Sequence, residues 1–260
     1  MNGKVWRVLA LLCGMAILVV AAAPARAQMS EVKEKPLMYS YVGFWNLPRG
    51  QWAEMEKSDA SDLPILDKAV ASGTLVGYGH DVNMVHQPDQ QTHDEWWSAM
   101  SMAGLMKVLE EFYKSGSTAA PVLGTATKHW DSIYVSRYYN WHPGSWKGIY
   151  THGSYYKLKA DAPSDALDRL SKNLFVPFFE KLLAEGTVLE YEVDTEAIHT
   201  EDPAGFYIFY LVPNAEALDK VSAALRLSGK EHPLIGPAFG SMVEYSSHRD
   251  YLVRTSAVYK

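Results

Sequence analysis

Hydrophobic and polar positions along the chain alternate between two periodicities. Short stretches of strand type, alternating or continuously apolar, are separated by longer stretches in which apolar residues recur every three or four positions. The clearest of the longer stretches carries apolar residues at Leu167, Leu170, Leu174, Phe178 and Leu182. This spacing predicts an amphipathic helix with one buried face.

The predicted elements come in the same order in both halves of the chain. The first half reads strand 39–45, helical region 50–72, strand 75–86, strand 95–99, helix 102–114 and strand 132–139. The second half reads strand 149–158, helical region 163–185, strand 188–199, strand 206–212, helix 215–227 and strand 251–258. The order β-α-β-β-α-β is that of the ferredoxin-like sandwich, an α+β fold whose helices cover one sheet face.

An internal duplication explains this shared order. Residues 64–89 align with residues 177–202 at a constant offset of 113, and nine of the 26 positions are identical, where chance gives roughly one or two. The identical pairs are Pro64/Pro177, Lys68/Lys181, Ala71/Ala184, Gly73/Gly186, Thr74/Thr187, Tyr78/Tyr191, Asp81/Asp194, His86/His199 and Asp89/Asp202. We therefore expect two ferredoxin-like repeats, 38–140 and 148–260.

Proline and glycine mark the limits of the predicted helices. Pro64 and Pro177 interrupt the two long helical regions at the matching place, which predicts a kink or a break into two helices. Gly73 and Gly186 stand where each region ends, as expected for the residue just past a helix C-terminus. The joint at 141–146 contains proline and glycine and is interpreted as a short linker.

Two strands indicate how the repeats pack. The segment 206–212 is continuously apolar or aromatic, which predicts burial on both faces, with the sheet of the sister repeat covering the face that lacks helices. Acidic residues alternate along the second strand of repeat two: Glu190, Glu192, Asp194 and Glu196. Because that strand lies at the edge of a ferredoxin-like sheet, the acidic row is interpreted as a solvated edge that discourages unwanted pairing, in preference to a cation site.

The N-terminus has the features of a signal peptide over residues 1–27. Lys4 and Arg7 precede an apolar run at 8–23, and Ala25 and Ala27 are small residues at the positions that a signal peptidase reads. The apolar run is short for a spanning helix, which needs roughly 20 residues. We expect an exported protein, periplasmic or secreted, without stable membrane insertion after cleavage. An uncleaved membrane anchor is the alternative.

Cysteine usage and charge exclude several classes of function. The only cysteine is Cys13, so the mature chain has no disulfide, no thiolate metal site and no cysteine nucleophile. Without residues 1–27 the formal charge is −9, which argues against nucleic acid and anionic lipid surfaces as partners. Glycine-rich phosphate loops, the serine elbow of hydrolases and the His-Glu-x-x-His zinc motif are all missing from the sequence.

The element order and the duplication together resemble the dimeric α/β-barrel superfamily, with two ferredoxin-like units fused in one chain and packed sheet to sheet as a pseudo-dimeric barrel. The superfamily includes cofactor-independent monooxygenases, haem-handling enzymes and non-catalytic ligand binders. The resemblance therefore implies small-molecule chemistry or binding, and leaves open whether the chain is an enzyme, which cofactor it uses and whether it dimerises further.

Histidines are the candidate catalytic residues: His80, His86, His129, His199 and His248. Four of them form pairs between the repeats, with an aspartate three residues after His86 and His199 and two residues after His129 and His248. A carboxylate beside an imidazole suits a general base, although such pairs also stabilise turns. His80 lies on an apolar strand face and is either a core histidine or a pocket group tuned by burial. No metal site is predicted.

Aromatic density points to a ligand. Such rings mostly fill cores, but tryptophan and tyrosine also suit a cavity for a planar organic molecule. The candidate ligand-binding residues are Tyr41, Trp45, Tyr78, His80, Trp96, His152 and Tyr191. The leading hypothesis is a small, partly aromatic organic ligand in a barrel cavity, with or without cofactor-independent oxidation. The alternatives are a haem-binding or haem-handling protein and a non-enzymatic envelope interaction module.

Overall fold

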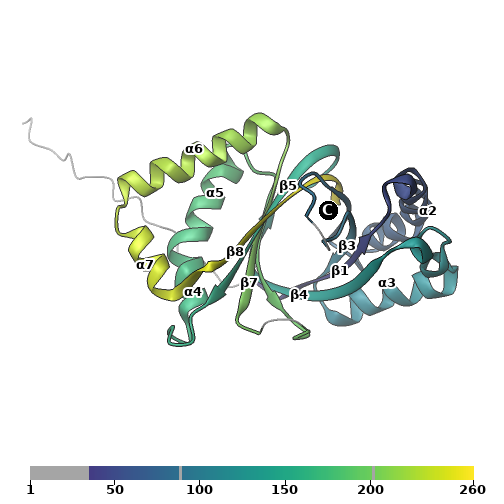
Figure 1. Cartoon of the computed structure of the whole chain (residues 1–260), viewed down its shortest axis with the longest axis horizontal. Helices are drawn as coiled ribbons and strands as arrows, with labels where there is room; N and C mark the ends of the chain where they lie inside the picture. The colour runs from purple at the N-terminus through teal and green to yellow at the C-terminus, as the bar shows by residue number, and fades with distance from the viewer. Residues whose placement is uncertain (1–34, 88–89, 201–202) are drawn as a thin grey trace, which may run out of the picture. The chain divides into compact units, whose positions relative to one another are not determined.

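The chain folds around one closed eight-stranded barrel, with helices packed against its outer surface (Figure 1). This is a computed structural model that describes residues 35–87, 90–200 and 203–260. The predicted signal segment, with Cys13, and the paired residues Asp89 and Asp202 lie outside the described residues. Around the barrel the strands follow the order β1-β3-β2-β8-β5-β7-β6-β4, and neighbouring strands are antiparallel.

Each repeat supplies four of these strands. The first repeat consists of β1 Met38–Asn46, η1 Arg49–Gln51, α2 Trp52–Ala71, β2 Gly77–Asn83, β3 His93–Ala99, α3 Met102–Ser115, η2 Ser117–Ala119, η3 Leu123–Thr125 and β4 Lys128–Trp141. The second repeat consists of β5 Gly144–Leu158, α4 Ala166–Leu170, the π-helix η4 Ser171–Phe175, α5 Val176–Ala184, β6 Glu190–Glu196, β7 Gly205–Val212, α6 Ala215–Glu231, α7 Ile235–Met242 and β8 Val243–Tyr259. The predicted order β-α-β-β-α-β is confirmed in both halves.

Local hydrogen bonds confirm the duplication. The backbone turns left-handed at Gly73 and Gly186, with φ of 74° and 69°, just past the ends of α2 and α5. The next residue in each repeat, Thr74 or Thr187, donates its N–H to a helix carbonyl at 2.9 Å. The predicted glycine caps are therefore present in both repeats with the same hydrogen bond, and glycine suits them because it adopts positive φ without a steric penalty.

The proline and linker predictions are only partly right. Helix α2 runs through Pro64 without a break, so a split into two helices is wrong for the first repeat. In the second repeat the helical region is interrupted by the π-helix η4 immediately before Val176 and Pro177. The predicted linker 141–146 is mostly strand, since only residues 142 and 143 separate β4 from β5. The connection between the two repeats is therefore too short to act as a flexible linker.

The barrel closes because the outer strands of the two repeats pair with each other. β2 pairs with β8, from Gly77 opposite Tyr259 to Asn83 opposite Val253, and β6 pairs with β4. The packing of the two sheets is thus a continuous ring of hydrogen bonds, and every strand has two neighbours. A closed ring removes the free edges that an open sheet must protect.

This closure contradicts the interpretation of the acidic row. Glu190, Glu192, Asp194 and Glu196 are buried, at most 8% exposed, and do not form a solvated edge. Their strand, β6, is hydrogen-bonded on both sides. The alternation along the strand therefore separates the barrel interior from the outer face, and the acidic residues take the interior positions.

Burial of β7 on both faces is confirmed. Tyr207, Phe209 and Leu211 line the cavity inside the barrel, and the alternate residues face the helices, as in the contact between Tyr210 and Phe179 of α5. The continuously apolar sequence of β7 is thus explained, because one face of the strand lines the barrel interior and the other packs against helices.

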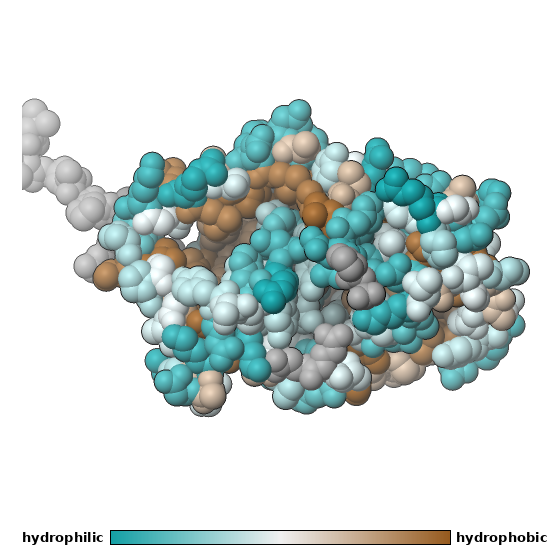
Figure 2. Space-filling model, in the orientation of Figure 1, coloured by the Kyte–Doolittle hydropathy of each residue, from teal (hydrophilic) through white to brown (hydrophobic). Residues whose placement is uncertain are grey.

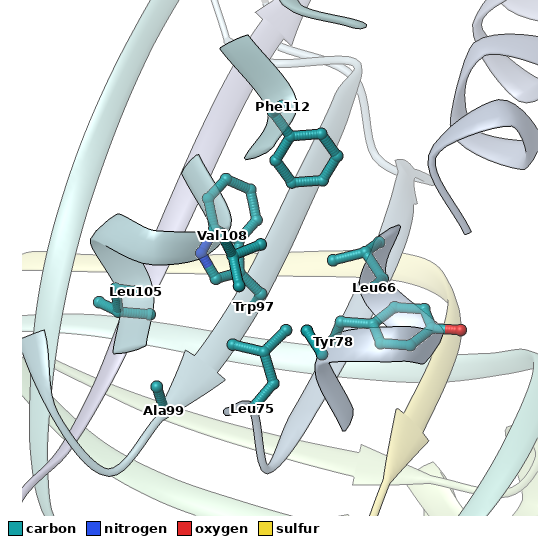
Figure 3. Packing of buried hydrophobic residues seen from close by; sticks show 9 residues of the cluster. Leu66, Leu75, Tyr78, Trp97, Ala99, Leu105, Val108 and Phe112 are labelled. Carbon is teal, nitrogen blue, oxygen red and sulfur yellow. The ribbon is translucent and has the colours of Figure 1, made fainter. Parts of the chain in front are cut away.

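A hydrophobic core holds α2 and α3 against the outer face of the first repeat's sheet (Figure 3). It contains Leu66, Leu75, Tyr78, Trp97, Ala99, Leu105, Val108 and Phe112. In the second repeat α6 buries only Ala217 and Val221, and the mostly apolar α7 buries none of its residues. Figure 2 shows apolar surface gathered in the hollow between these two helices. None of the helices in the described part of the chain has the length and apolar character needed to cross a membrane.

Candidate functional site

A pocket of about 500 Å³ lies between the outer face of the first repeat's sheet, α3 and the segment that follows α3. Strands β1, β3 and β4 form its floor and the residues from Ser117 to Gly124 form one wall. The residues that line it are Tyr41, Trp45, Asp62, Glu95, Trp97, Leu109, Phe112, Tyr113, Ser117, Thr118, Ala119, Ala120, Pro121, Leu123, Gly124, His129 and Asp131. Its volume falls in the range of small-molecule sites.

Stacked rings form much of the pocket lining. Tyr41 and Trp97 stack with ring centroids 4.3 Å apart and planes 16° from parallel. Trp45 and His129 stack at 4.9 Å and 11°. These pairs place flat apolar faces on neighbouring strands, because β1 pairs with both β3 and β4. Such surfaces favour a planar ligand.

Three carboxylates provide the polar part of the lining: Asp62, Glu95 and Asp131. Asp62 comes from α2 and Glu95 from β3, and they are 6% and 8% exposed. Oδ1 of Asp62 is buried without a hydrogen-bond partner, whereas Oε1 of Glu95 lies 3.3 Å from Nε2 of His80. A buried acceptor without a donor costs roughly 1–3 kcal/mol, so a ligand with a hydroxyl or N–H group would relieve that cost at Asp62.

His80 stands behind Glu95. The two residues face each other in the β2–β3 register, with His80 Nε2 3.3 Å from Glu95 Oε1. Burial alone lowers the pKa of His80, but attraction by the Glu95 carboxylate, with Asp59 and Asp81 beyond it, outweighs burial and raises the pKa to about 9. At neutral pH His80 is therefore a buried cation paired with Glu95.

The acids contributed by α2 hold their protons more tightly than usual. Burial raises the pKa of Asp59 to about 7, against an opposing attraction by His80. Burial also raises the pKa of Asp62, with Ser117 lowering it and Glu95 adding repulsion. A carboxylate whose pKa is moved toward neutrality is suited to accept a proton from a weakly acidic substrate.

The structure brings together only some of the residues expected to bind a ligand. Tyr41, Trp45 and His129 line the pocket, and His80 lies behind its wall. Trp96 faces the barrel interior, where its indole N–H donates to Asp81 at 3.2 Å.

Tyr78 and Tyr191 make the same bond in the two repeats. Tyr78 donates its hydroxyl to Asp67, and Tyr191 donates its hydroxyl to Glu180, each at 2.7 Å. Both acceptors lie eleven residues before the tyrosine, on α2 and α5. These tyrosines hold a helix against the sheet.

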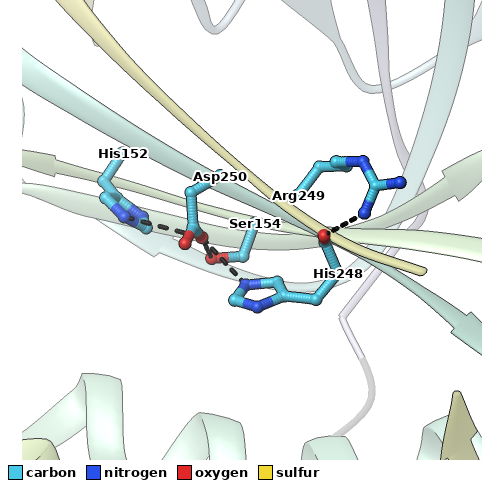
Figure 4. A network of polar contacts seen from close by, with 5 residues as sticks. All are labelled: His152, Ser154, His248, Arg249 and Asp250. Carbon is cyan, nitrogen blue, oxygen red and sulfur yellow. Dashed lines mark hydrogen bonds and ion pairs between the residues drawn. The ribbon is translucent and has the colours of Figure 1, made fainter. Parts of the chain in front are cut away.

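His152 and His248 form a separate cluster on the second repeat (Figure 4). Nε2 of His248 lies 3.0 Å from Asp250 Oδ1, and Nε2 of His152 lies 3.7 Å from the same oxygen. Ser154 donates to that oxygen at 2.8 Å. The expected contact between His248 and the aspartate two residues later is confirmed, and so is that of His129 with Asp131, at 3.6 Å.

The remaining paired histidines are exposed. The ring of His86 packs with its centroid 5.3 Å from that of Trp52, and His199 lies three residues past the end of β6. The ring nitrogen Nδ1 of His129 donates to the carbonyl of Phe44 at 2.9 Å. Haem ligation by His129 Nδ1, or by His80 or His248 through Nε2, would thus displace an existing protein contact.

Asp62, Glu95 and Trp97 were missed by sequence reasoning. One signal was available for Glu95: in a β2–β3 hairpin, the residue opposite His80 is set by register, and an acid there is a natural histidine partner. Nothing in the sequence indicated that Asp62 lines the pocket, because its place there depends on the position of α2 relative to the sheet.

Comparisons with known proteins support the fold. No family model and no curated protein sequence matches the chain. A solved structure from Lactobacillus acidophilus NCFM, provisionally described as a monooxygenase, aligns with a TM-score of 0.63 and 10% identity, over 86% of this chain and 97% of that one. A second protein with the same provisional description, from Fusobacterium nucleatum, aligns with a TM-score of 0.60 and 7% identity over 86% and 94% of the two chains.

An anthrone oxidase-like protein aligns with a TM-score of 0.52 and 13% identity, covering 87% of this chain and 92% of the other. At such identities the similarity establishes architecture only. The chain has the fold of the dimeric α/β-barrel superfamily, with both halves of the barrel in one polypeptide.

Proposed function

We propose that this protein binds a small, partly aromatic organic molecule in the first-repeat pocket and oxidises it with molecular oxygen, without a resident cofactor. The observation that carries the proposal is Asp62. Its carboxylate is buried, has one oxygen without a partner and a raised pKa, and lines a pocket to which Tyr41, Trp45, Trp97, Phe112 and Tyr113 contribute aromatic rings. The provisional monooxygenases and the anthrone oxidase-like protein of the same fold support the choice of reaction class.

The substrate chemistry follows from the lining. Three carboxylates disfavour an anionic ligand and favour one that presents hydrogen-bond donors. A polycyclic aromatic ketone with an activated CH₂ group and phenolic hydroxyls, such as 1,8-dihydroxyanthrone, has flat faces for Tyr41 and Trp97 and a hydrogen-bond donor for Glu95.

In the proposed reaction Asp62 removes a proton from the activated carbon. The electron-rich carbanion adds O₂ to give a peroxide anion, which takes the proton back from Asp62, and the hydroperoxide then loses water. The substrate CH₂ thus becomes a carbonyl, one oxygen atom enters the product and the other leaves as water. The buried His80 cation lies behind Glu95, where its charge stabilises negative charge that develops in the pocket.

The test uses mature protein and 1,8-dihydroxyanthrone, whose oxidation product absorbs differently. Binding is followed by quenching of tryptophan fluorescence, and turnover by oxygen consumption and product absorbance. We expect Asp62→Asn to abolish turnover while leaving binding within about threefold, because the amide keeps the shape but cannot take up the proton. Glu110→Gln, an exposed position on α3, is the matched control.

The outcomes separate the two parts of the proposal. If 1,8-dihydroxyanthrone and related hydroxyanthrones bind without oxygen uptake, the oxidation step is refuted and a binding protein remains. If none of them binds, the pocket assignment fails. A Soret band on protein purified from its native host would instead favour the haem alternative.

Export is proposed on the sequence alone. The basic start, the apolar run and the small residues before Gln28 support a signal peptide. Intact mass of the protein from a periplasmic or culture fraction should correspond to a chain that begins at Gln28. A full-length mass in the membrane fraction would indicate an uncleaved anchor.

A further inference from the structure

The barrel interior contains a second cavity, separate from the first-repeat pocket. It has a volume of about 140 Å³ and is lined from all eight strands. Its lining residues Phe44, Trp130 and Tyr251 are only partly buried, so the cavity approaches the surface at the end of the barrel where these residues lie. The first-repeat pocket lies on the other side of the barrel wall.

Carboxylates stand on two opposite walls of this cavity. Asp81 and Asp94 come from β2 and β3, where they face each other in the strand register. Glu192 and Asp194 come from β6. In the ring order β1-β3-β2-β8-β5-β7-β6-β4, β2 and β6 are four strands apart, which is half the circumference.

Several polar atoms on these walls lack partners. Oδ1 of Asp81, Oδ1 of Asp194 and the hydroxyl of Tyr259 are buried without a hydrogen bond, in residues that are at most 5% exposed. All three residues line the cavity. None of the described residues that line it is a lysine or an arginine. Buried carboxylates normally have a cationic or donor partner, so these atoms indicate a missing one.

Aromatic rings supply the rest of the lining and decide the kind of cation. Trp96, Tyr134, Tyr207 and Phe209 surround the carboxylates. A hard metal ion prefers six to eight oxygen ligands around it, whereas an organic ammonium ion has an apolar body that suits ring faces and N–H groups that suit carboxylates.

We infer that the barrel interior binds a small organic ammonium compound, held between the acidic wall of β2 and β3 and the acidic wall of β6. An ammonium group brings both the positive charge and the hydrogen-bond donors that the unpartnered oxygens lack. Two facing walls favour a compound with two amino groups.

Burial raises the pKa of all four carboxyls, that of Glu192 to about 7. Because protons compete with a cationic ligand for these oxygens, binding should be measured at pH 8. The inference does not depend on the proposed oxidation, because it concerns a different cavity.

The test is calorimetric titration of the mature protein with 1,4-diaminobutane, butylamine and the neutral 1,4-butanediol. We expect the diamine to bind more tightly than the monoamine and the diol not to bind. Asp81→Asn and Asp194→Asn should each weaken diamine binding by about tenfold or more, because each removes a charge-assisted hydrogen bond from one wall. Glu110→Gln on the surface of α3 should leave it unchanged.

The asparagine variants keep the side-chain shape, and circular dichroism of the unliganded proteins verifies that they fold. Equal heats for the diamine and the diol would overturn the inference. The inference would also be overturned if only one of the two substitutions weakened binding, because the ligand would then contact one wall and not both. Binding of Mg²⁺ or Ca²⁺ that is lost in both variants, with no amine binding, would show an inorganic cation site instead.

Discussion

The pair of His80 and Glu95 should give the protein a stability that depends on pH. Both side chains are about 10% exposed and lie 3.3 Å apart, so solvent screens their attraction little. The pKa of His80 is about 9 in the folded protein, against 6.5 for an unperturbed histidine. The folded state therefore binds the His80 proton more tightly than the unfolded state does.

The sign and size follow from linkage. A raised histidine pKa contributes stability that is fully present below pH 6.5 and is lost as the pH rises through 9. At about 1.4 kcal/mol per pKa unit, the contribution is about 3 kcal/mol. Glu95→Gln removes the carboxylate that raises the pKa, and burial then keeps His80 neutral.

The assay is urea unfolding of wild type and Glu95→Gln at pH 6 and pH 9.5. Between these values the wild type should lose about 3 kcal/mol more free energy of unfolding than the variant does. Titrating groups that do not interact with His80 or Glu95 act on both proteins and cancel in the comparison. A His80 imidazole titration near pH 9 by NMR would confirm the cause. Identical pH dependence of the two proteins would refute the reasoning.

Three further substitutions test the fold. Glu190 is fully buried, and both its carboxylate oxygens lack partners. Burial raises its pKa well above the usual value. The native state therefore keeps a proton that the unfolded state loses above about pH 4.3. Stability should fall by up to about 1.4 kcal/mol per pH unit above that value, and Glu190→Gln should remove the fall, as pH-dependent urea unfolding will show. A Cβ at Gly79 would lie 2.4 Å from the Trp96 ring, so Gly79→Ala should cost about 1–3 kcal/mol by thermal unfolding, whereas Gly50→Ala, with no atom within 4 Å, should not. Tyr191→Phe removes the donor to Glu180 and should cost roughly 1–3 kcal/mol; no loss would mean that this bond does not hold α5 on the sheet.

The candidate site was only half visible in the sequence. Tyr41, Trp45 and His80 were expected from aromatic density and from a lone histidine on an apolar strand face, and they lie in or next to the pocket. Asp62 and Trp97 were not expected, because a pocket between a helix and a sheet depends on the distance between two elements, which no periodicity encodes.

The architecture, by contrast, was determined largely by the sequence itself. Element order, the two repeats, the glycine caps at Gly73 and Gly186 and the double burial of 206–212 are local or periodic properties, and each is present in the structure. They were predictable because hydrophobic period and backbone preference act over a few residues.

Only the tertiary structure decided which face of each strand is the inside. The alternation of Glu190, Glu192, Asp194 and Glu196 separates two faces but does not name them, and the usual preference for charge in water assigned them to solvent. Pairing of β6 with β4 and of β2 with β8 closed the ring and turned that face inward. Barrel closure joins strands far apart in sequence, so its consequence for these carboxylates could not be predicted from neighbouring residues.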